Sequence, residues 1–348
     1  MNNVTQQQIK RTFHFINNFE QYGAHKSIAI IDNAQSDYDI TIAIPTYKRP
    51  ALLAEAIDSA INQIDVPANI KYEILVVDND PQRKSETESL LRNRYSLIKD
   101  FSYYKNEKNL HVFGNWNRCF ELARAKWVVL LHDDDLLSPQ YISYMCSLLD
   151  EMKDAAIIKP AMRNWYDNGE SPRLSFPKLT SKKYYQVHTV DYIFMGNYFG
   201  APTCCLFNKN IMKESGGFTH ELEPCGDIAT VFHLAMYYKV YLLKQVLGIQ
   251  RVGKNETVKP EVLSLFMAVR YNMTLFLINK YHLNWLLGNW YLIPMIHIFY
   301  HTIQKWWNRD FNYDISLLQK GHLTLGNCFF YRSINFIYRI LWKIRHTF

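Results

Sequence analysis

The sequence predicts an α/β fold, with a mostly parallel central sheet flanked by helices and a helical region at the C-terminal end. Three observations support this prediction. Short apolar segments alternate with helical patterns between residues 39 and 255, which is typical of parallel strands joined by helices. Three of these segments end in polar or acidic clusters. Beyond Pro260 the sequence is strongly aromatic and has a helical character.

The predicted elements follow in order from Thr41. The run TIAIP is short and apolar, as a buried strand is, and the helical pattern after it begins at Pro50, which suits a first helical turn. The segment WVVLLHD leads directly into three aspartates. Residues 162–200 show weak periodicity, and we expect a loop or hairpin insertion there. The predicted strands are 41–45, 72–78, 101–106, 127–133, 155–160, 201–207 and 240–252, and the predicted helices are 51–64, 113–125, 139–152 and 228–238.

The composition indicates a packed globular protein. Hydrophobic residues make up 48% of the 348 residues and charged residues 20%, whereas disordered chains are less apolar. The six cysteines form no CxxC pair and no Cys/His spacing for zinc. The N-terminus lacks the apolar stretch of a secretory signal. We therefore expect free thiols in a reducing, cytoplasmic compartment.

Polar and acidic clusters follow three of the predicted strands. They are Pro45-Thr46-Tyr47, Asp78-Asn79-Asp80 and Asp133-Asp134-Asp135. Ligands of parallel α/β sheets bind at the carboxyl ends of the strands. The convergence of three clusters on this edge predicts a nucleotide pocket.

The aspartates at 133–135 can hold a divalent cation. Mg²⁺ and Mn²⁺ bind one or two carboxylates and keep other positions for phosphate oxygens. Asp133 and Asp135 are the predicted ligands, and for His132 a supporting or packing role is favoured over ligation. The alternative is a solvated loop that caps the following helix.

Two further aspartates have a functional and a structural interpretation. Asp78 can accept a hydrogen bond from the nucleobase or ribose of a nucleotide, or it can simply initiate the turn in DNDP. Asp227 can act as a general base if a desolvated pocket raises its pKa, or it can be the N-cap of the helix that follows.

The C-terminal region is basic and rich in tryptophan. Residues 260–348 contain nine Lys/Arg against three Asp/Glu, within a chain of net charge +7, and five of its eight tryptophans. This combination suits an anionic membrane surface, and no nucleic-acid motif accompanies it. The uncharged run 281–304 contains Gly288, Pro294, three His and two Asn, which favours a buried or interfacial helix over a transmembrane one. The amphipathic pattern INFIYRILWKIRHTF suits a membrane-surface helix or a helix packed on the catalytic domain.

Four segments together resemble the family 2 glycosyltransferases, which have the Rossmann-like GT-A fold. They cover residues 39–250 in the family's order, and a match in several parts is more specific than a single motif. The segments are TIAIPTYKRPALLAEAIDSAINQ, YEILVVDND, NLHVFGNWNRCFELARAKWVVLLHDDDLLSP and GGFTHELEPCGDIATVFHLA.

The resemblance implies a role for each candidate residue. The 133–135 cluster would be the DxD motif that carries Mg²⁺ or Mn²⁺, with Asp133 and Asp134 also near the nucleotide. Asp227 would be the base of a direct displacement that inverts the anomeric carbon, and Gly216–Gly217 would shape the acceptor side. The uridine part of the donor would be held by Pro45, Thr46, Tyr47, Arg49, Asp78, Asn109 and Asn117.

The sequence also departs from the family pattern. His132 stands where the commonest form has an aspartate, which leaves open which of Asp133 and Asp135 binds the metal. Gly226 replaces the usual glutamate before the base. The processive signature QxxRW is absent, because the chain has GIQRVGKN near that place. Addition of a single sugar is therefore favoured over polymer synthesis.

The resemblance implies a hexosyltransferase that uses a nucleotide-sugar, with UDP favoured by family habit. We expect a polyprenyl-diphosphate-linked saccharide as acceptor, in surface polysaccharide synthesis at the inner face of the cell membrane. The expected division is a 1–38 extension, a 39–255 catalytic domain and a 256–348 helical region that associates with the membrane. A non-catalytic sugar-binding or scaffold protein of the same fold is the alternative. A sugar nucleotidyltransferase would carry a glycine-rich loop that PTYKRPA lacks.

Overall fold

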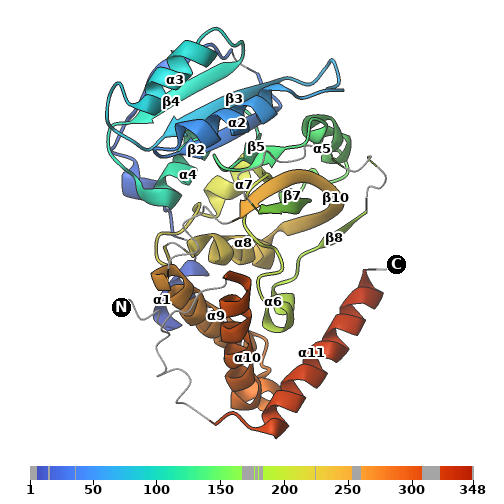
Figure 1. Ribbon diagram of the computed structural model, residues 1–348. Helices are drawn as coiled ribbons and strands as arrows, with labels where there is room; N and C mark the ends of the chain where they lie inside the picture. The colour runs from blue at the N-terminus through green and yellow to red at the C-terminus, as the bar shows by residue number, and fades with distance from the viewer. Residues whose placement is uncertain are drawn as a thin grey trace.

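A computed structural model of the chain describes residues 6–14, 16–35, 37–166, 176, 179, 183–223, 225–252, 260–307 and 322–346. The sheet and the helices that cover it form one part of the molecule. Three long C-terminal helices lie at one end of that part, at the bottom of Figure 1.

The described strands form one mixed sheet of ten. They are β1 (Ser27–Asp32), β2 (Ile40–Thr46), β3 (Tyr72–Asp78), β4 (Phe101–Asn106), β5 (Trp127–Leu130), β6 (Leu136–Leu137), β7 (Ala155–Tyr166), β8 (Tyr184–Gln186), β9 (Cys205–Asn208) and β10 (Lys239–Val252). Their order is β1-β4-β3-β2-β5-β9-β7-β10-β6, and β8 also pairs with β10.

Most of the predicted strands lie in the parallel parts of the sheet. β4, β3, β2 and β5 are parallel neighbours, and β7 is parallel to β10. β9 runs antiparallel between β5 and β7. The predicted α/β fold is confirmed, and the carboxyl ends of β2, β3 and β5 share one edge as that fold requires.

Helices cover both faces of the sheet. They are α2 (Pro50–Ile61), α3 (Glu86–Tyr95), α4 (His111–Leu122), α5 (Tyr141–Leu149), α7 (Lys209–Glu214) and α8 (Gly226–Tyr237). Neighbouring residues of β2 show the two-sided burial, because Ile42 and Ile44 pack with α2 and α5 while Ala43 packs in the cluster that contains α4 and α8. Alternation of side chains across a strand produces this division.

Some elements differ from the prediction. α3 was not predicted, because SETESLLRNRY is largely polar, although Ser85 caps the helix by accepting a hydrogen bond from the Glu88 amide. β5 ends at Leu130, so the aspartates lie in the turn before β6. In the predicted insertion 162–200 the structure places the end of β7, β8 and a short helix, α6 (Thr189–Met195), while most of 167–182 lies outside the described residues.

The N-terminal segment is folded onto the rest of the molecule. It contains α1 (Gln6–Thr12), a 3₁₀ turn over Glu20–Tyr22, and β1, which pairs antiparallel with β4. Ile9 is buried, and the ring of Phe13 stacks on Phe276 with centroids 4.7 Å apart. The amide of Asn18 donates to the carbonyl of Gly216 at 2.9 Å. This segment therefore contacts both the sheet region and the C-terminal helices.

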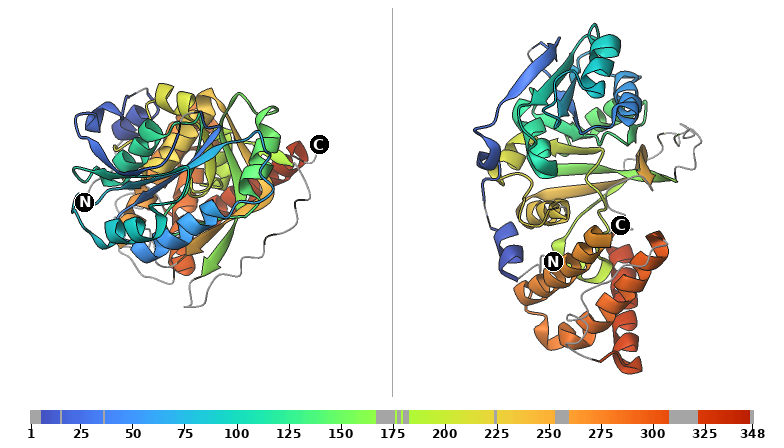
Figure 2. Two further views of the ribbon diagram at one scale, coloured as in Figure 1. Left: turned by 90° about the horizontal axis from the view of Figure 1, so that it is seen from above. Right: turned by 60° about the vertical axis from the view of Figure 1, so that its left-hand side comes forward.

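The C-terminal helices are α9 (Pro260–Lys280), α10 (Asn284–Trp307) and α11 (Leu325–Arg345). α10 has a non-helical residue at Gly288 and contains Pro294. Among the described helices, α9 is the one long and apolar enough to cross a bilayer, and more than half of its apolar stretch is buried inside the protein. α9 packs against α1, α6 and α10, whereas α11 lies at the outer edge of the molecule (Figure 2).

Candidate active site

The end of β2 and the acidic turn meet at the predicted edge of the sheet. The hydroxyl of Thr46 donates to Asp133 Oδ2 at 2.7 Å. Arg49 Nη1 lies 3.2 Å from Asp134 Oδ2 and 3.6 Å from Asp133 Oδ1. The loop after β2 and the aspartates, 84 or more positions apart in the sequence, thus form one polar surface.

The turn at 132–135 contains a group of side chains that could hold a metal ion. Ligand atoms of His132, Asp134 and Asp135 all lie within 4.8 Å of one another. Asp133, which was a predicted ligand, already engages Thr46 and Arg49. Nε2 of His132 is buried and has no hydrogen-bond partner in the described part of the chain. One imidazole and two carboxylates form a donor set that suits Mn²⁺ and is also acceptable to Mg²⁺, so the residues fit the implied cation.

Burial and mutual repulsion perturb the pKa values of this turn. Burial, followed by the charge of Asp134, raises the pKa of Asp133 to about 6 and that of Asp135 to about 8. Burial lowers the pKa of His132 to about 4, so its imidazole is neutral at pH 7 and able to bind a metal. The cap alternative for this turn is wrong, because α5 has Gln140 at its N-cap and both Asp133 and Asp135 are buried.

Two residues that the sequence did not single out hold Asp135 in place. The backbone amide of Arg251 donates to Asp135 Oδ1 at 2.9 Å, and its Nε donates to the carbonyl of Asp134 at 3.1 Å. Thr203 gives Asp135 a side-chain hydrogen bond. The guanidinium of Arg251 also lies 4.1 Å from the ring centroid of Trp165 and pairs with Glu55. Arg251 lies in the segment GIQRVGKN, where its role gave no local signal.

Asp78 ends β3 at the predicted edge, but its carboxylate is engaged within the protein. Oδ2 accepts hydrogen bonds from Lys105 Nζ at 2.7 Å and from the Tyr103 hydroxyl at 2.8 Å, and Oδ1 accepts from the Asp80 amide. The side chain is completely buried. Contact between Asp78 and a nucleotide stays a prediction, and the geometry shows that Asp78 orients Tyr103 and Lys105.

The other predicted nucleotide contacts are distributed along the same edge. Pro45 is buried in β2, while Tyr47 is exposed in the loop that follows. Asn109 accepts a hydrogen bond from Asn79 at 3.0 Å, beside the end of β3. The amide of Asn117 donates to the carbonyl of Phe218 and accepts from its backbone N–H. Asn117 therefore fixes the segment after Gly217, and its contact with the donor stays a prediction.

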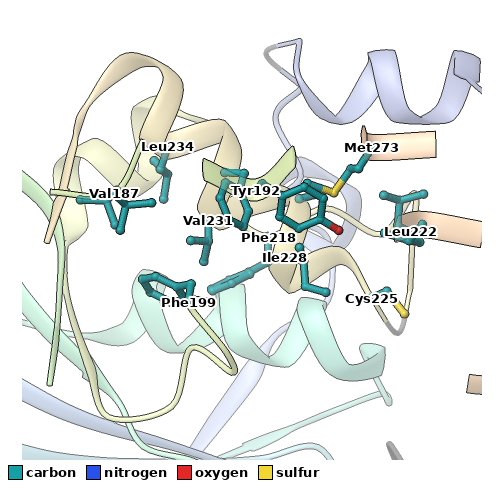
Figure 3. Close-up of a cluster of buried hydrophobic side chains, with 14 of the residues drawn as sticks. Val187, Tyr192, Phe199, Phe218, Leu222, Cys225, Ile228, Val231, Leu234 and Met273 are labelled. Carbon is teal, nitrogen blue, oxygen red and sulfur yellow. The ribbon is translucent and has the colours of Figure 1, made fainter. Parts of the chain in front are cut away.

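Asp227 lies in the first turn of α8, above an apolar cluster. Ile228, Val231 and Leu234 of the same helix pack among Tyr192, Phe218 and Met273 (Figure 3). The N-cap alternative is wrong, because Cys225 occupies that position. Oδ1 of Asp227 is buried, and none of the residues that the structure describes gives it a hydrogen bond. Burial raises the pKa of Asp227 to about 6, the range in which a carboxylate works as a general base near neutral pH.

Gly226, next to Asp227, has a steric reason to lack a side chain. A Cβ at this position would lie 2.3 Å from the carbonyl oxygen of Thr219 and 2.9 Å from the ring of Phe113. The glutamate of the commonest family form does not fit here. We expect Gly226→Ala to lower the free energy of unfolding by about 1–3 kcal/mol, as overpacking does, measured by urea denaturation. Gly23→Ala is the control, since a Cβ there makes ordinary contacts of 3.5 Å or more, and an equal loss in both variants would contradict the explanation.

Comparison with known proteins places most of this site in one family. The family model for glycosyl transferase family 2 matches residues 41–216. The uncharacterized protein MT1568 of Mycobacterium tuberculosis is 23% identical over 222 residues, which cover 61% of this chain and 66% of that protein. The minor teichoic acid biosynthesis protein GgaB of Bacillus subtilis is 28% identical over 118 residues, which cover 34% of this chain and 13% of that protein. The chain thus spans less than two thirds of either relative.

A solved structure shares the fold. The mannosyltransferase PcManGT from Pyrobaculum calidifontis, in complex with GDP-Man and Mn²⁺, is 15% identical and matches with a TM-score of 0.50, covering 86% of this chain and 81% of that one. At this identity the likeness shows the fold alone. The segment matched by the family model ends before Asp227, so the role of that residue depends on the geometry described above.

Proposed function

This chain belongs to glycosyl transferase family 2, and from that premise we propose that it transfers a single sugar from a nucleotide-sugar to an acceptor hydroxyl with inversion at the anomeric carbon. The observation that carries the proposal is a buried carboxylate oxygen of Asp227 that has no hydrogen-bond partner among the described residues. The charge of Lys159 acts on both Asp135 and Asp227, which supports placing Asp227 and the acidic turn in one site.

In the proposed reaction, different residues of the chain act on the acceptor, the donor and the cation. Asp227 takes the proton of the acceptor hydroxyl while the new bond from that oxygen to the anomeric carbon forms and the bond to the diphosphate breaks. Thr46 and Arg49 hold Asp133 and Asp134 in position for the donor. A divalent cation, Mg²⁺ or Mn²⁺, held by His132, Asp134 and Asp135 would neutralise charge on the departing nucleoside diphosphate.

The test is nucleotide release from UDP-, GDP- and dTDP-sugars, with Mn²⁺, Mg²⁺ or EDTA, in the presence of membrane extract as acceptor. We propose a UDP-sugar as donor and expect one donor to be turned over in a metal-dependent way. Turnover of a GDP- or dTDP-sugar instead would show that the donor nucleotide is GDP or dTDP and not UDP. If no donor binds or reacts with any metal, the non-catalytic sugar-binding or scaffold function replaces the proposal.

We further propose that the acceptor is a lipid-linked saccharide, of the polyprenyl-diphosphate type, at the inner face of the cell membrane. The similarity to a teichoic acid biosynthesis protein supports a surface polysaccharide. The helix α11 supports the proposed location at the membrane. Its side toward the protein carries polar contacts, such as Asn335, which accepts a hydrogen bond from the Tyr291 hydroxyl at 2.8 Å, and Arg345, which pairs with Asp191 at 2.8 Å.

The opposite side of α11 is apolar and exposed. Phe329 is 74% exposed and Phe336 66%. The remaining exposed apolar side chains of the helix are Leu325, Ile337, Ile340, Leu341 and Ile344. Trp285, 82% exposed, and Trp290 lie on α10, and the Trp290 ring contacts Phe330 of α11. Because Arg332, Arg339 and Lys343 flank this face, it matches an anionic lipid surface better than a second apolar protein face.

We expect the protein to bind vesicles that contain phosphatidylglycerol and to lose at least tenfold in affinity when Phe329 and Phe336 are both replaced by Asp. Each buried aromatic ring contributes about 1.5–3 kcal/mol to such binding. Vesicle flotation measures the effect. Leu97→Asp is the control, since Leu97 is 96% exposed on the catalytic region. Equal binding to neutral phosphatidylcholine vesicles would contradict the membrane proposal. A protein that forms dimers and does not bind vesicles would contradict it as well.

A further inference from the structure

Lys159 is a buried lysine inside the candidate active site. It lies on β7 within the apolar run AAIIKP and is 6% exposed. Its charge interacts with Asp135 of the acidic turn, with Asp227 at the start of α8, and with His132. The ammonium group is therefore close enough to both carboxylate sites of the proposed reaction for its charge to act on each of them.

The hydrogen-bonding capacity of this ammonium is mostly unused among the described residues. Lys159 Nζ donates to the carbonyl of Ala201 and lies 4.6 Å from the ring centroid of Phe199. An ammonium has three N–H donors, and the described residues supply that one acceptor. Gly200, between Phe199 and Ala201, has φ +74° and places no side chain over the group. Burial of a charged donor without acceptors is costly, so a ligand that supplies acceptors would be bound favourably here.

Charge limits the kind of ligand that fits. The carboxylates of Asp135 and Asp227 offset the positive charge of Lys159 when they are ionised. An acidic sugar would add a further negative charge to a site that contains the aspartates of the turn and, in the proposed reaction, a diphosphate. The missing partners are therefore neutral oxygen acceptors, such as hydroxyl or amide oxygens.

The position of Lys159 limits the kind of ligand further. In the proposed function the acidic turn is on the diphosphate side and Asp227 is on the side of the acceptor hydroxyl. The bond that forms and the bond that breaks share the anomeric carbon, so the transferred sugar must lie between these two groups. We propose that Lys159 contacts the transferred sugar and selects an uncharged one by donating hydrogen bonds to its oxygens. This inference rests on the proposed function and adds the substrate class to it.

The test compares wild type with Lys159→Met, which keeps the length of the side chain and removes the donors. We expect kcat/KM for the preferred nucleotide-sugar to fall about 10- to 100-fold, because hydrogen bonds from a charged group are lost. Discrimination between sugars on the same nucleotide should weaken. Binding of free UDP, or of free GDP if the donor is a GDP-sugar, should stay within twofold. Lys209→Met is the matched control, since Lys209 also donates to backbone carbonyls, those of Ala123 and Arg124, away from the site.

The outcomes separate this inference from the proposed function. Absence of any donor turnover by wild type refutes the proposed function itself. Normal kcat/KM and unchanged sugar selectivity in Lys159→Met overturn the inference alone. Equal weakening of free nucleoside diphosphate and of the nucleotide-sugar overturns it in favour of a diphosphate contact. If the sugar of the preferred donor carries a carboxylate, the proposal that the transferred sugar is uncharged is wrong.

A second measurement begins with wild-type protein, so that its first result does not depend on whether a variant folds. Deoxy analogues of the preferred donor, each lacking one hydroxyl, are assayed with wild-type protein. One analogue should lose about 10- to 100-fold in kcat/KM, and the same analogue should show no additional loss in Lys159→Met. Uniform tolerance of all the analogues by wild type overturns the inference.

Discussion

Asp227→Asn is expected to reduce turnover about 10²- to 10⁴-fold, the usual contribution of a general base, while the nucleotide-sugar still binds. Asn has nearly the same shape but cannot take a proton, and the Oδ1 position that it keeps has no partner to lose among the residues that the structure describes. Single-turnover kinetics measures the chemical step, and titration with the nucleotide-sugar measures binding.

The pH profile tests the same residue. Burial raises the pKa of Asp227 to about 6, so the carboxylate is protonated below that pH and cannot act as a base. We expect wild-type kcat/KM to fall about tenfold for each pH unit below 6. Asp154→Asn is the control for the loss of turnover in Asp227→Asn, and it should keep wild-type turnover because Asp154 pairs with Lys239 at the surface. Turnover of Asp227→Asn within a few-fold of wild type would exclude the base role and direct attention to another carboxylate.

Asp135→Asn is expected to abolish both metal-dependent turnover and the stabilisation of the protein by Mn²⁺. In wild type a bound cation stabilises the fold by RT ln(1 + [Mn²⁺]/Kd), which is about 2.7 kcal/mol at a hundredfold excess over Kd. Removal of one of the grouped ligand atoms weakens that binding. The melting temperature, measured with Mn²⁺ and with EDTA, should rise with the metal in wild type and stay constant in the variant.

The same variant has a predicted effect on stability without metal. The pKa of Asp135 is raised in the folded protein to about 8, by burial and then by Asp134. Its ionisation therefore opposes folding, and this cost appears as the pH rises from about 4 to 8. Asn carries no charge, so in EDTA at pH 8 we expect Asp135→Asn to melt at or above the wild-type temperature. A variant that melts much lower in EDTA would indicate that the hydrogen bond from Arg251 to Asp135 dominates. Asp154→Asn, at an exposed aspartate that pairs with Lys239, is the control.

The parts of the site that the sequence predicted are those with a local signal. The TIAIP and WVVLLHD strands have apolar runs that end in polar clusters, and the parallel order places those ends side by side, as Thr46 and Asp133 show. α11 likewise has its amphipathic pattern in the sequence. Apolar runs were sufficient for these strands because strands buried on both faces of a parallel sheet are continuously hydrophobic, and helical spacing was sufficient for α11.

The parts that the sequence did not predict depend on contacts between distant segments. Arg251 holds Asp135 across 116 positions of the chain, and nothing near GIQRVGKN indicates that partner. The engagement of Asp78 by Lys105 is likewise a tertiary contact. Lys159 did give a signal, because a lysine inside an apolar strand requires a partner or a function, but its neighbours Asp227 and Asp135 become visible only in the fold.

The N-terminal segment determines where the chain can be shortened. The family match begins at residue 41, and a recombinant form that starts there would look complete by homology. It would lack β1, which leaves the edge of β4 open to pairing with other molecules. It would also lack Phe13, which uncovers Phe276 on α9. Aggregation of such a form would reflect a missing cover rather than an unstable sheet region, so recombinant forms of this protein should begin before Gln6.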